Sequence, residues 1–147
     1  MSVNYYNAER YADPTAYEAL TSITSVKKHR KKISNYNGTA VFICSPYAGE
    51  TEKNIVKACE YCKFAVSENR IPYAPHLLFP QFLDENDPAQ RELGIRMGLV
   101  FLQKCREVWV FGTVTAGMRM EINLAQRCHI PIRYFNEKCE EVSPCET

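Results

Sequence analysis

The sequence predicts an α/β fold: a doubly wound parallel sheet of the flavodoxin or Rossmann type, with four to five strands, flanking helices and an additional N-terminal helix. Three observations predict it. Short segments rich in β-branched and aromatic residues alternate with longer segments of helical periodicity. Polar residues and glycines follow those short segments, at the carboxyl ends of the expected strands, where parallel sheets bind ligands. With 147 residues, 46% of them hydrophobic, the chain can bury the core of one compact domain.

The first segment, 1–38, is expected to be a helical extension that precedes the sheet. Asp13-Pro14 is a helix start signal, because aspartate accepts a hydrogen bond from a free backbone N–H and proline needs no such bond. Tyr17 and Leu20 begin an apolar stripe, and the basic run 27–32 ends the helix. A basic run could also bind nucleic acid, but a solvated helix end is favoured because the chain has no excess of positive charge.

The remaining elements follow in regular alternation. Strands are expected at 39–44, 71–74, 107–111 and 130–135, and helices at 50–68, 88–104 and 116–128. Asp87-Pro88 repeats the start signal for the second of these helices. The loop 75–88 is long for a strand-to-helix connection, and long connections in compact domains are often binding loops. The α/β domain is therefore expected to span 39–135, and 136–147 is expected to be a polar tail that frays.

Charge, hydropathy and cysteine content argue against a nucleic-acid-binding, membrane-bound or disulfide-stabilised protein. The 18 basic and 17 acidic side chains leave a net charge of +1, so neither nucleic acid nor a membrane is the expected partner. No apolar run approaches the roughly 20 residues of a membrane span, and residues 1–14 lack the features of a signal peptide, so a cytoplasmic location is expected. The seven cysteines are expected to be reduced thiols. Cys59 and Cys62 form a CxxC pair, but core packing is favoured over a metal or redox site because no second ligand pair follows.

Candidate site residues lie where the expected strands end. Ser45-Pro46-Tyr47-Ala48-Gly49 follows the first strand, Pro75-His76 the second, and the stretch from Gly112 to Glu121 the third. A glycine permits close approach of the backbone, and a helix N-terminus offers free N–H groups, so these junctions suit a phosphate or a sugar hydroxyl. Arg91, Arg96 and Arg119 could bind phosphate too, although surface ion pairs are the favoured interpretation.

Three motifs carry a family resemblance. "ICSPYAG" at 43–49, "PHLLFP" at 75–80 and "GMRME" at 117–121 resemble the nucleoside 2-deoxyribosyltransferase-like family, especially its small bacterial and phage-borne members of undefined function. The resemblance covers residues 4 to 135 and implies a doubly wound sheet, a homo-oligomer, and a site that cleaves or binds an N-glycosidic bond. It also implies that Glu121 is the nucleophile and that Tyr47 hydrogen-bonds its carboxylate.

The expected roles are as follows. The catalytic candidates are Glu121, Tyr47, Asp84 and Asp87, the last two as proton donors to the departing base. The substrate-binding candidates are Ser45, Pro46, Ala48, Gly49, His76, Gly112, Thr115, Gly117 and Met118. Asp87 is also the expected helix cap. His76 is a third candidate for the proton or hydrogen bond to the departing base, and bonding of the loop backbone is its alternative role. No metal and no cofactor are expected.

Three functions remain open at this point. The favoured one is an enzyme that splits or transfers an N-glycosidic bond of a nucleoside, nucleotide or related metabolite. The second is a protein on the same scaffold that binds or sequesters a nucleotide-like ligand without turnover. The third is an interaction module whose N-terminal helix docks a partner. A firm general-acid partner for Glu121 would favour catalysis, and the sequence names none.

Overall fold

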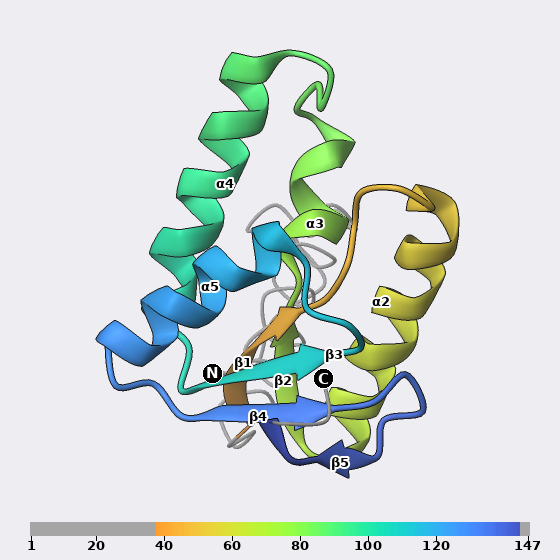
Figure 1. Cartoon of the computed structure of the whole chain (residues 1–147), viewed down its shortest axis with the longest axis vertical. Helices are drawn as coiled ribbons and strands as arrows, with labels where there is room; N and C mark the ends of the chain where they lie inside the picture. The colour runs from red at the N-terminus through yellow and green to blue at the C-terminus, as the bar shows by residue number, and fades with distance from the viewer. Residues whose placement is uncertain (1–37, 145–147) are drawn as a thin grey trace, which may run out of the picture. The chain divides into compact units, whose positions relative to one another are not determined.

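The computed structural model describes residues 38–144, and these residues form the α/β unit that the sequence predicts. Its elements in chain order are β1 (Thr39–Cys44), α2 (Thr51–Ser67), β2 (Arg70–Tyr73), α3 (Pro75–Leu78), the 3-10 turn η1 (Phe79–Gln81), α4 (Pro88–Leu102), β3 (Glu107–Phe111), α5 (Ala116–Arg127), β4 (Ile132–Phe135) and β5 (Glu141–Val142). The strand order is β2-β1-β3-β4-β5 (Figure 1). The first four strands are parallel and β5 is antiparallel to β4. The expected N-terminal helix and basic run lie outside the described residues.

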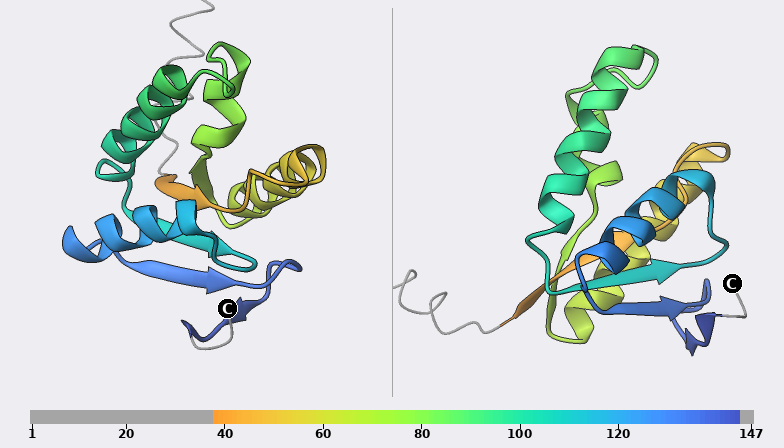
Figure 2. Two further views of the ribbon diagram at one scale, coloured as in Figure 1. Left: turned by 45° about the horizontal axis from the view of Figure 1, so that its top comes forward. Right: turned by 60° about the vertical axis from the view of Figure 1, so that its left-hand side comes forward.

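The two central strands are buried on both faces, which explains their continuous apolar sequence. Val41–Cys44 and Val108–Phe111 are fully buried, as expected for parallel strands covered by helices on both sides. Successive residues point to opposite faces. Val41 and Ile43 therefore pack with residues of α2, whereas Phe42 and Cys44 pack with residues of α5. Helices α2 and α5 lie on opposite faces of the sheet (Figure 2).

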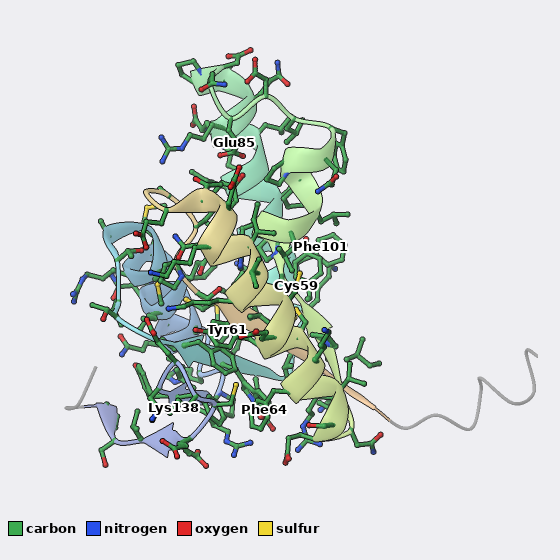
Figure 3. The ribbon with its side chains drawn as sticks, turned by 90° about the vertical axis from the view of Figure 1, so that its right-hand side faces the viewer. Cys59, Tyr61, Phe64, Glu85, Phe101 and Lys138 are labelled. Carbon is green, nitrogen blue, oxygen red and sulfur yellow. The ribbon has the colours of Figure 1, made fainter. Side chains whose placement is uncertain are left out.

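Helix α2 covers its face of the sheet mainly with aromatic side chains. Tyr61 stacks on Phe111 with ring centroids 4.2 Å apart, and Phe64 meets Phe135 edge-on at 5.4 Å. Figure 3 labels Tyr61 and Phe64 on α2. Cys62 is half-buried against this cluster, as predicted, but the expectation that Cys59 also packs in the core is wrong. Ala58, Tyr61 and Ala65 form the buried stripe of α2, and Cys59 lies beside that stripe in solvent.

The segment after β4 differs from the expected fraying tail. Residues 141–142 form β5 on the edge of the sheet. The side chain of Asn136 accepts hydrogen bonds from the backbone N–H groups of Lys138 and Glu140, which stabilises the turn. Arg133 of β4 then donates two hydrogen bonds to the carboxylate of Glu141, at 2.9 and 2.8 Å. Polar side chains therefore order this segment through local hydrogen bonds, and Cys139 packs against the core cluster on the α2 side of the sheet.

Helix α4 stands close to α3 and η1 and extends beyond the sheet (Figure 1). Two glycines of α4 lie at this contact, and a Cβ atom added to either would meet its neighbours at ordinary van der Waals distance. A Cβ atom on Gly98 would lie 3.4 Å from Cβ of Pro75, and one on Gly94 would lie 3.4 Å from Cδ1 of Leu83. Together α3, η1 and α4 border the space beyond the carboxyl ends of the strands. Within residues 38–144, no helix is long and apolar enough to cross a membrane.

Candidate functional site

A pocket of about 380 Å³ lies beyond the carboxyl ends of the strands, where open α/β sheets bind their ligands. Its size is in the range of small-molecule sites. The β1–α2 junction contributes Ser45, Tyr47 and Ala48; α3 and η1 contribute Pro75, His76, Phe79 and Pro80; the following loop contributes Glu85; α4 contributes Arg91, Gly94, Ile95, Gly98 and Leu99; and α5 with its cap contributes Thr115, Ala116, Gly117, Met118, Met120 and Glu121.

The pocket brings together most of the residues proposed from the sequence. Among its lining residues are Ser45, Tyr47, Ala48, His76, Thr115, Gly117, Met118 and Glu121. Five proposed residues do not line it: Pro46, Gly49, Gly112, Asp84 and Asp87. Gly49 and Gly112 serve the backbone instead, because both have a positive φ, of 95° and 71°, in the turns that follow β1 and β3.

The cap of α5 places Glu121 one and a half turns into that helix. The hydroxyl of Thr115 accepts a hydrogen bond from the N–H of Met118 at 3.3 Å, so this side chain is an N-cap as well as a pocket residue. Met118 and Ile122 bury the inner face of α5. Glu121 lies next to that face and is half-buried, with its carboxyl group in the pocket lining.

Burial controls the charge of Glu121. Loss of solvation raises the pKa of its carboxyl group to about 7, while a hydrogen bond with the thiol of Cys44 acts in the opposite direction. The carboxyl group is therefore divided between its neutral and ionised forms near neutral pH. A carboxyl group with a raised pKa in a pocket is a typical feature of a functional site.

Ser45 and His76 form a second polar feature of the pocket. The Ser45 hydroxyl lies 3.0 Å from Nε2 of His76, although the two residues are 31 positions apart in the sequence. Burial lowers the pKa of His76 to about 4, so the imidazole is neutral at pH 7. The ring of Tyr47 lies beside it, with ring centroids 6.1 Å apart. Burial, and secondarily the charge of Glu85, raise the pKa of the Tyr47 phenol.

Comparison with known proteins gives the chain a family. The family described as "Domain of unknown function (DUF7768)" matches residues 39–135. The chain belongs to this family. The matched residues begin with β1, end with β4 and include every residue that lines the pocket of this DUF7768 domain. No curated protein matches the sequence.

A solved structure shows a distant structural relationship of the DUF7768 domain. It is described as the 2-deoxyribosyltransferase of the psychrotolerant bacterium Bacillus psychrosaccharolyticus, a biocatalyst for the synthesis of antiviral and antitumoral nucleosides. The TM-score is 0.53 at 14% sequence identity, over 71% of this chain and 77% of that one. At this identity the similarity establishes the fold.

The loop before α4 of the DUF7768 domain uses its acidic residues differently from the sequence-based expectation. Asp87 caps α4, accepting from the N–H of Ala89 at 2.9 Å and from the side chain of Gln90 at 3.0 Å. Asp84 accepts from the N–H of Asn86 within the same loop. Glu85, which lies between them and was not proposed, is the loop carboxylate that lines the pocket. The length and acidity of this loop were the sequence signals that pointed to a binding role. They do not indicate which of its acidic residues lines the pocket.

Helix α4 supplies further pocket residues, of which the sequence analysis named only Arg91, as a possible phosphate ligand. Arg91, Gly94, Ile95, Gly98 and Leu99 recur at intervals of three and four, the spacing of one helix face. Arg91 is exposed and forms no ion pair within residues 38–144, whereas Arg96 on another face pairs with Glu92 as expected. The periodicity of this face could have been found in the sequence, but not the fact that it borders the ligand pocket.

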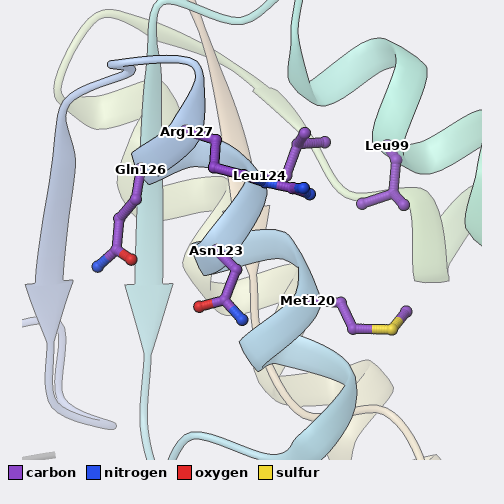
Figure 4. Close-up of a pocket in the computed structure, with 6 residues that line it drawn as sticks. All are labelled: Leu99, Met120, Asn123, Leu124, Gln126 and Arg127. Atoms are coloured by element: carbon purple, nitrogen blue, oxygen red, sulfur yellow. The ribbon is translucent and has the colours of Figure 1, made fainter.

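A second cavity, of about 710 Å³, lies between α4 and α5 (Figure 4). Its lining residues are Leu99, Met120, Asn123, Leu124, Gln126 and Arg127. Although it is larger, it contains no carboxylate, histidine or cysteine, so the smaller pocket is the better candidate for chemistry. Within the described part of the chain, no cluster of three or more histidine, cysteine, aspartate or glutamate side chains is placed to hold a metal ion.

Proposed function

We propose that this DUF7768 domain cleaves or transfers an N-glycosidic bond of a nucleoside, nucleotide or related metabolite, with Glu121 as nucleophile. The observation that carries the proposal is the position of Glu121. Its carboxyl group lines a pocket of nucleoside size at the carboxyl ends of the strands. The fold is that of a 2-deoxyribosyltransferase, which supports glycosyl transfer as the class of reaction.

The proposed reaction has two steps. The ionised carboxylate of Glu121 attacks the anomeric carbon, the bond between that carbon and the base nitrogen breaks, and the sugar becomes an ester of Glu121. Water or a second base then attacks the same carbon and releases the carboxylate. In this scheme the phenol of Tyr47 and the hydroxyl of Ser45 hold the sugar or orient the carboxylate, since both line the pocket.

The departing base carries away the bond electrons and has to gain a proton. His76 is poorly suited to donate it at pH 7, because burial lowers its pKa to about 4 and leaves it neutral. Asp84 and Asp87 do not line the pocket. Glu85 does, and we assign to it a hydrogen-bonding contact with the base, which takes its proton from water as it leaves.

A binding protein on the same scaffold is the second candidate, and the pKa of Glu121 favours it. Near pH 7 much of the carboxyl group is protonated, and a protonated carboxyl donates a hydrogen bond but is a poor nucleophile. The Ser45 hydroxyl and Nε2 of His76 lie 3.0 Å apart and present a paired polar group to a ligand. A pocket of this kind would hold a nucleotide-like ligand without breaking it.

The experiment that separates the two candidates uses the full-length chain and a panel of nucleosides, nucleotides and dinucleotides. Free base is measured by chromatography, and bound ligand by calorimetry. For the enzyme, Glu121→Gln is expected to retain binding and to lose about 10³-fold or more in cleavage, because an amide cannot form the glycosyl ester. Tyr47→Phe is expected to lose less, since the nucleophile remains.

Glu60→Gln is the matched control, because Glu60 is an exposed glutamate of α2 outside the pocket. Full turnover by Glu121→Gln would eliminate Glu121 as nucleophile. Tight binding without base release, in both the wild-type protein and Glu121→Gln, would establish the binding protein instead. Mass spectrometry of the protein quenched with substrate should detect a glycosyl ester on the peptide that contains Glu121.

A further inference from the structure

Ser45 and His76 are hydrogen-bonded in the pocket, and the proposed reaction leaves the role of this pair undefined. Ser45 directly follows β1 and is only 6% exposed, yet it lines the pocket. Its hydroxyl lies 3.0 Å from Nε2 of His76, the second residue of α3. The ring of Tyr47 borders the pair, with its centroid 6.1 Å from that of His76. Two paired polar groups that line a pocket can meet a ligand as one preformed unit.

We propose that the Ser45–His76 pair is the subsite for a hydroxyl group of the substrate's sugar. Ser45 contacts that hydroxyl, and His76 is the positioning residue for Ser45. This part of the pocket therefore takes a free sugar hydroxyl rather than a phosphate. The inference deepens the proposed function and rests on it in that the ligand is nucleoside-like.

Packed elements hold both side chains of the pair. Strand β1 pairs with β2 on one side and with β3 on the other, so the backbone that leads into Ser45 belongs to the centre of the sheet. His76 follows Pro75, which is buried at the start of α3. Cβ of Pro75 lies 3.4 Å from the position that a Cβ atom on Gly98 of α4 would take, so α3 contacts α4 at this point. The pair is therefore built on packed secondary structure.

The hydrogen-bonding groups of the pair match those of a hydroxyl. A neutral imidazole has one donor and one acceptor nitrogen, and a serine hydroxyl has one donor and two acceptor sites. When Nε2 of His76 carries the proton, it donates to Ser45, whose own O–H can then donate to a ligand. When Nε2 instead accepts from Ser45, the Ser45 oxygen can accept from a ligand. The pair can therefore serve either the oxygen or the proton of a sugar hydroxyl.

A phosphate group matches the pair less well. It is negatively charged at pH 7, and its strongest hydrogen bonds come from charged donors. Burial lowers the pKa of His76 to about 4, so the pair carries no charge at pH 7. The other ionisable groups that line the pocket are Tyr47, Glu85 and Glu121, which add no positive charge, and Arg91. A phosphate would find its charged donor in Arg91, which stands on α4 and not in the pair.

The first arm of the test is NMR of the His76 ring nitrogens in the full-length protein, with 2-deoxyribose and inorganic phosphate as separate probes. Deoxyribose is expected to shift the His76 signals until they saturate, and phosphate at the same concentration to leave them unchanged. Ser45→Ala should abolish the response to deoxyribose. Ser67→Ala is the matched control, because Ser67 is an exposed serine of α2 outside the pocket, and it should respond as the wild-type protein does.

The second arm is calorimetry with the common 2′-deoxynucleosides, matched analogues that lack the 3′- or the 5′-hydroxyl, and the corresponding 5′-monophosphates. Loss of the contacted hydroxyl is expected to weaken binding by about tenfold, the value of one well-formed hydrogen bond. Ser45→Ala should weaken the nucleoside by the same factor and leave the hydroxyl-free analogue unaffected, because both changes remove one contact. His76→Gln, whose amide can replace Nε2, should keep more of the hydroxyl preference than His76→Leu.

Several results would overturn the hydroxyl subsite. Equal weakening of the nucleoside and its hydroxyl-free analogues by Ser45→Ala would mean that the pair only shapes the pocket. Tighter binding of a 5′-monophosphate that depends on Ser45 would make the pair a phosphate subsite. Equal losses in His76→Gln and His76→Leu would overturn the positioning role of His76.

The first arm needs neither a base nor turnover, so it separates the subsite from the proposed reaction. A response of His76 to deoxyribose without cleavage of any nucleoside would remove the proposed reaction and retain the subsite. Cleavage that depends on Glu121, without a response of His76 to deoxyribose and without a hydroxyl preference, would retain the reaction and remove the subsite.

Discussion

Replacing Glu121 with glutamine should change how the free energy of unfolding depends on pH. Burial raises the pKa of Glu121 from 4.5 to about 7. Between those values the folded protein holds a proton that the unfolded chain releases, so rising pH favours unfolding. The favourable contribution of the protonated group is complete below pH 4.5 and is lost as the pH rises through about 7. Glutamine does not titrate and should abolish this loss.

The size of the effect follows from the two pKa values. With about 1.4 kcal/mol per pKa unit, Glu121 lowers the free energy of unfolding by about 2.5 kcal/mol between about pH 5 and about pH 8. His76 acts in the opposite direction, because its pKa falls from 6.5 to about 4 in the folded protein. Over the same interval it should add about 2 kcal/mol. The two groups nearly cancel in the wild-type protein, so its own pH profile reveals neither.

The assay is urea unfolding of the wild-type protein, Glu121→Gln and the control Glu60→Gln at about pH 5 and about pH 8. Relative to the wild-type protein, Glu121→Gln should gain about 2.5 kcal/mol on going to the higher pH, and Glu60→Gln should gain nothing comparable. The variant should also reveal the increase due to His76. If Glu121→Gln and the wild-type protein keep the same difference within about 0.5 kcal/mol, Glu121 is not held in a desolvated environment, and the reasoning fails.

Two further predictions concern the loop before α4 and the assembly. Asp87→Ala should lower the free energy of unfolding by about 1 kcal/mol through loss of the α4 cap and leave ligand affinity unchanged, whereas Glu85→Gln should weaken ligand binding. Urea unfolding measures the first effect and calorimetry the second. If Asp87→Ala weakened ligand binding and Glu85→Gln did not, Asp87 would be the residue that faces the ligand. A homo-oligomer is expected from the resemblance to deoxyribosyltransferases, and light scattering at micromolar concentration should report a mass above that of one chain; a monomer alone would contradict it.

The sequence by itself determined most of the secondary structure and much of the site. It missed α3 and η1, which form in the stretch expected to be a loop, and β5, which forms in the expected tail. The observed bounds of α2, α4 and α5 lie within two residues of those predicted, because helical periodicity and caps such as Asp87-Pro88 are local signals. The alternation of strand-like and helical segments predicted a parallel sheet flanked by helices. Since the carboxyl ends of parallel strands share one edge, the junctions at Ser45, His76 and Glu121 could be expected to meet.

Tertiary packing alone decided what those residues can do. The packing of α4 against α3 and η1, at Gly94 and Gly98, decides which acidic residue of the preceding loop lines the pocket. That residue is Glu85. The contact between Ser45 and His76 joins residues 31 positions apart. The pKa of Glu121 depends on its burial beside Cys44 of another element. Sequence patterns report local conformation, whereas desolvation and hydrogen bonding between distant elements exist only once the chain has folded.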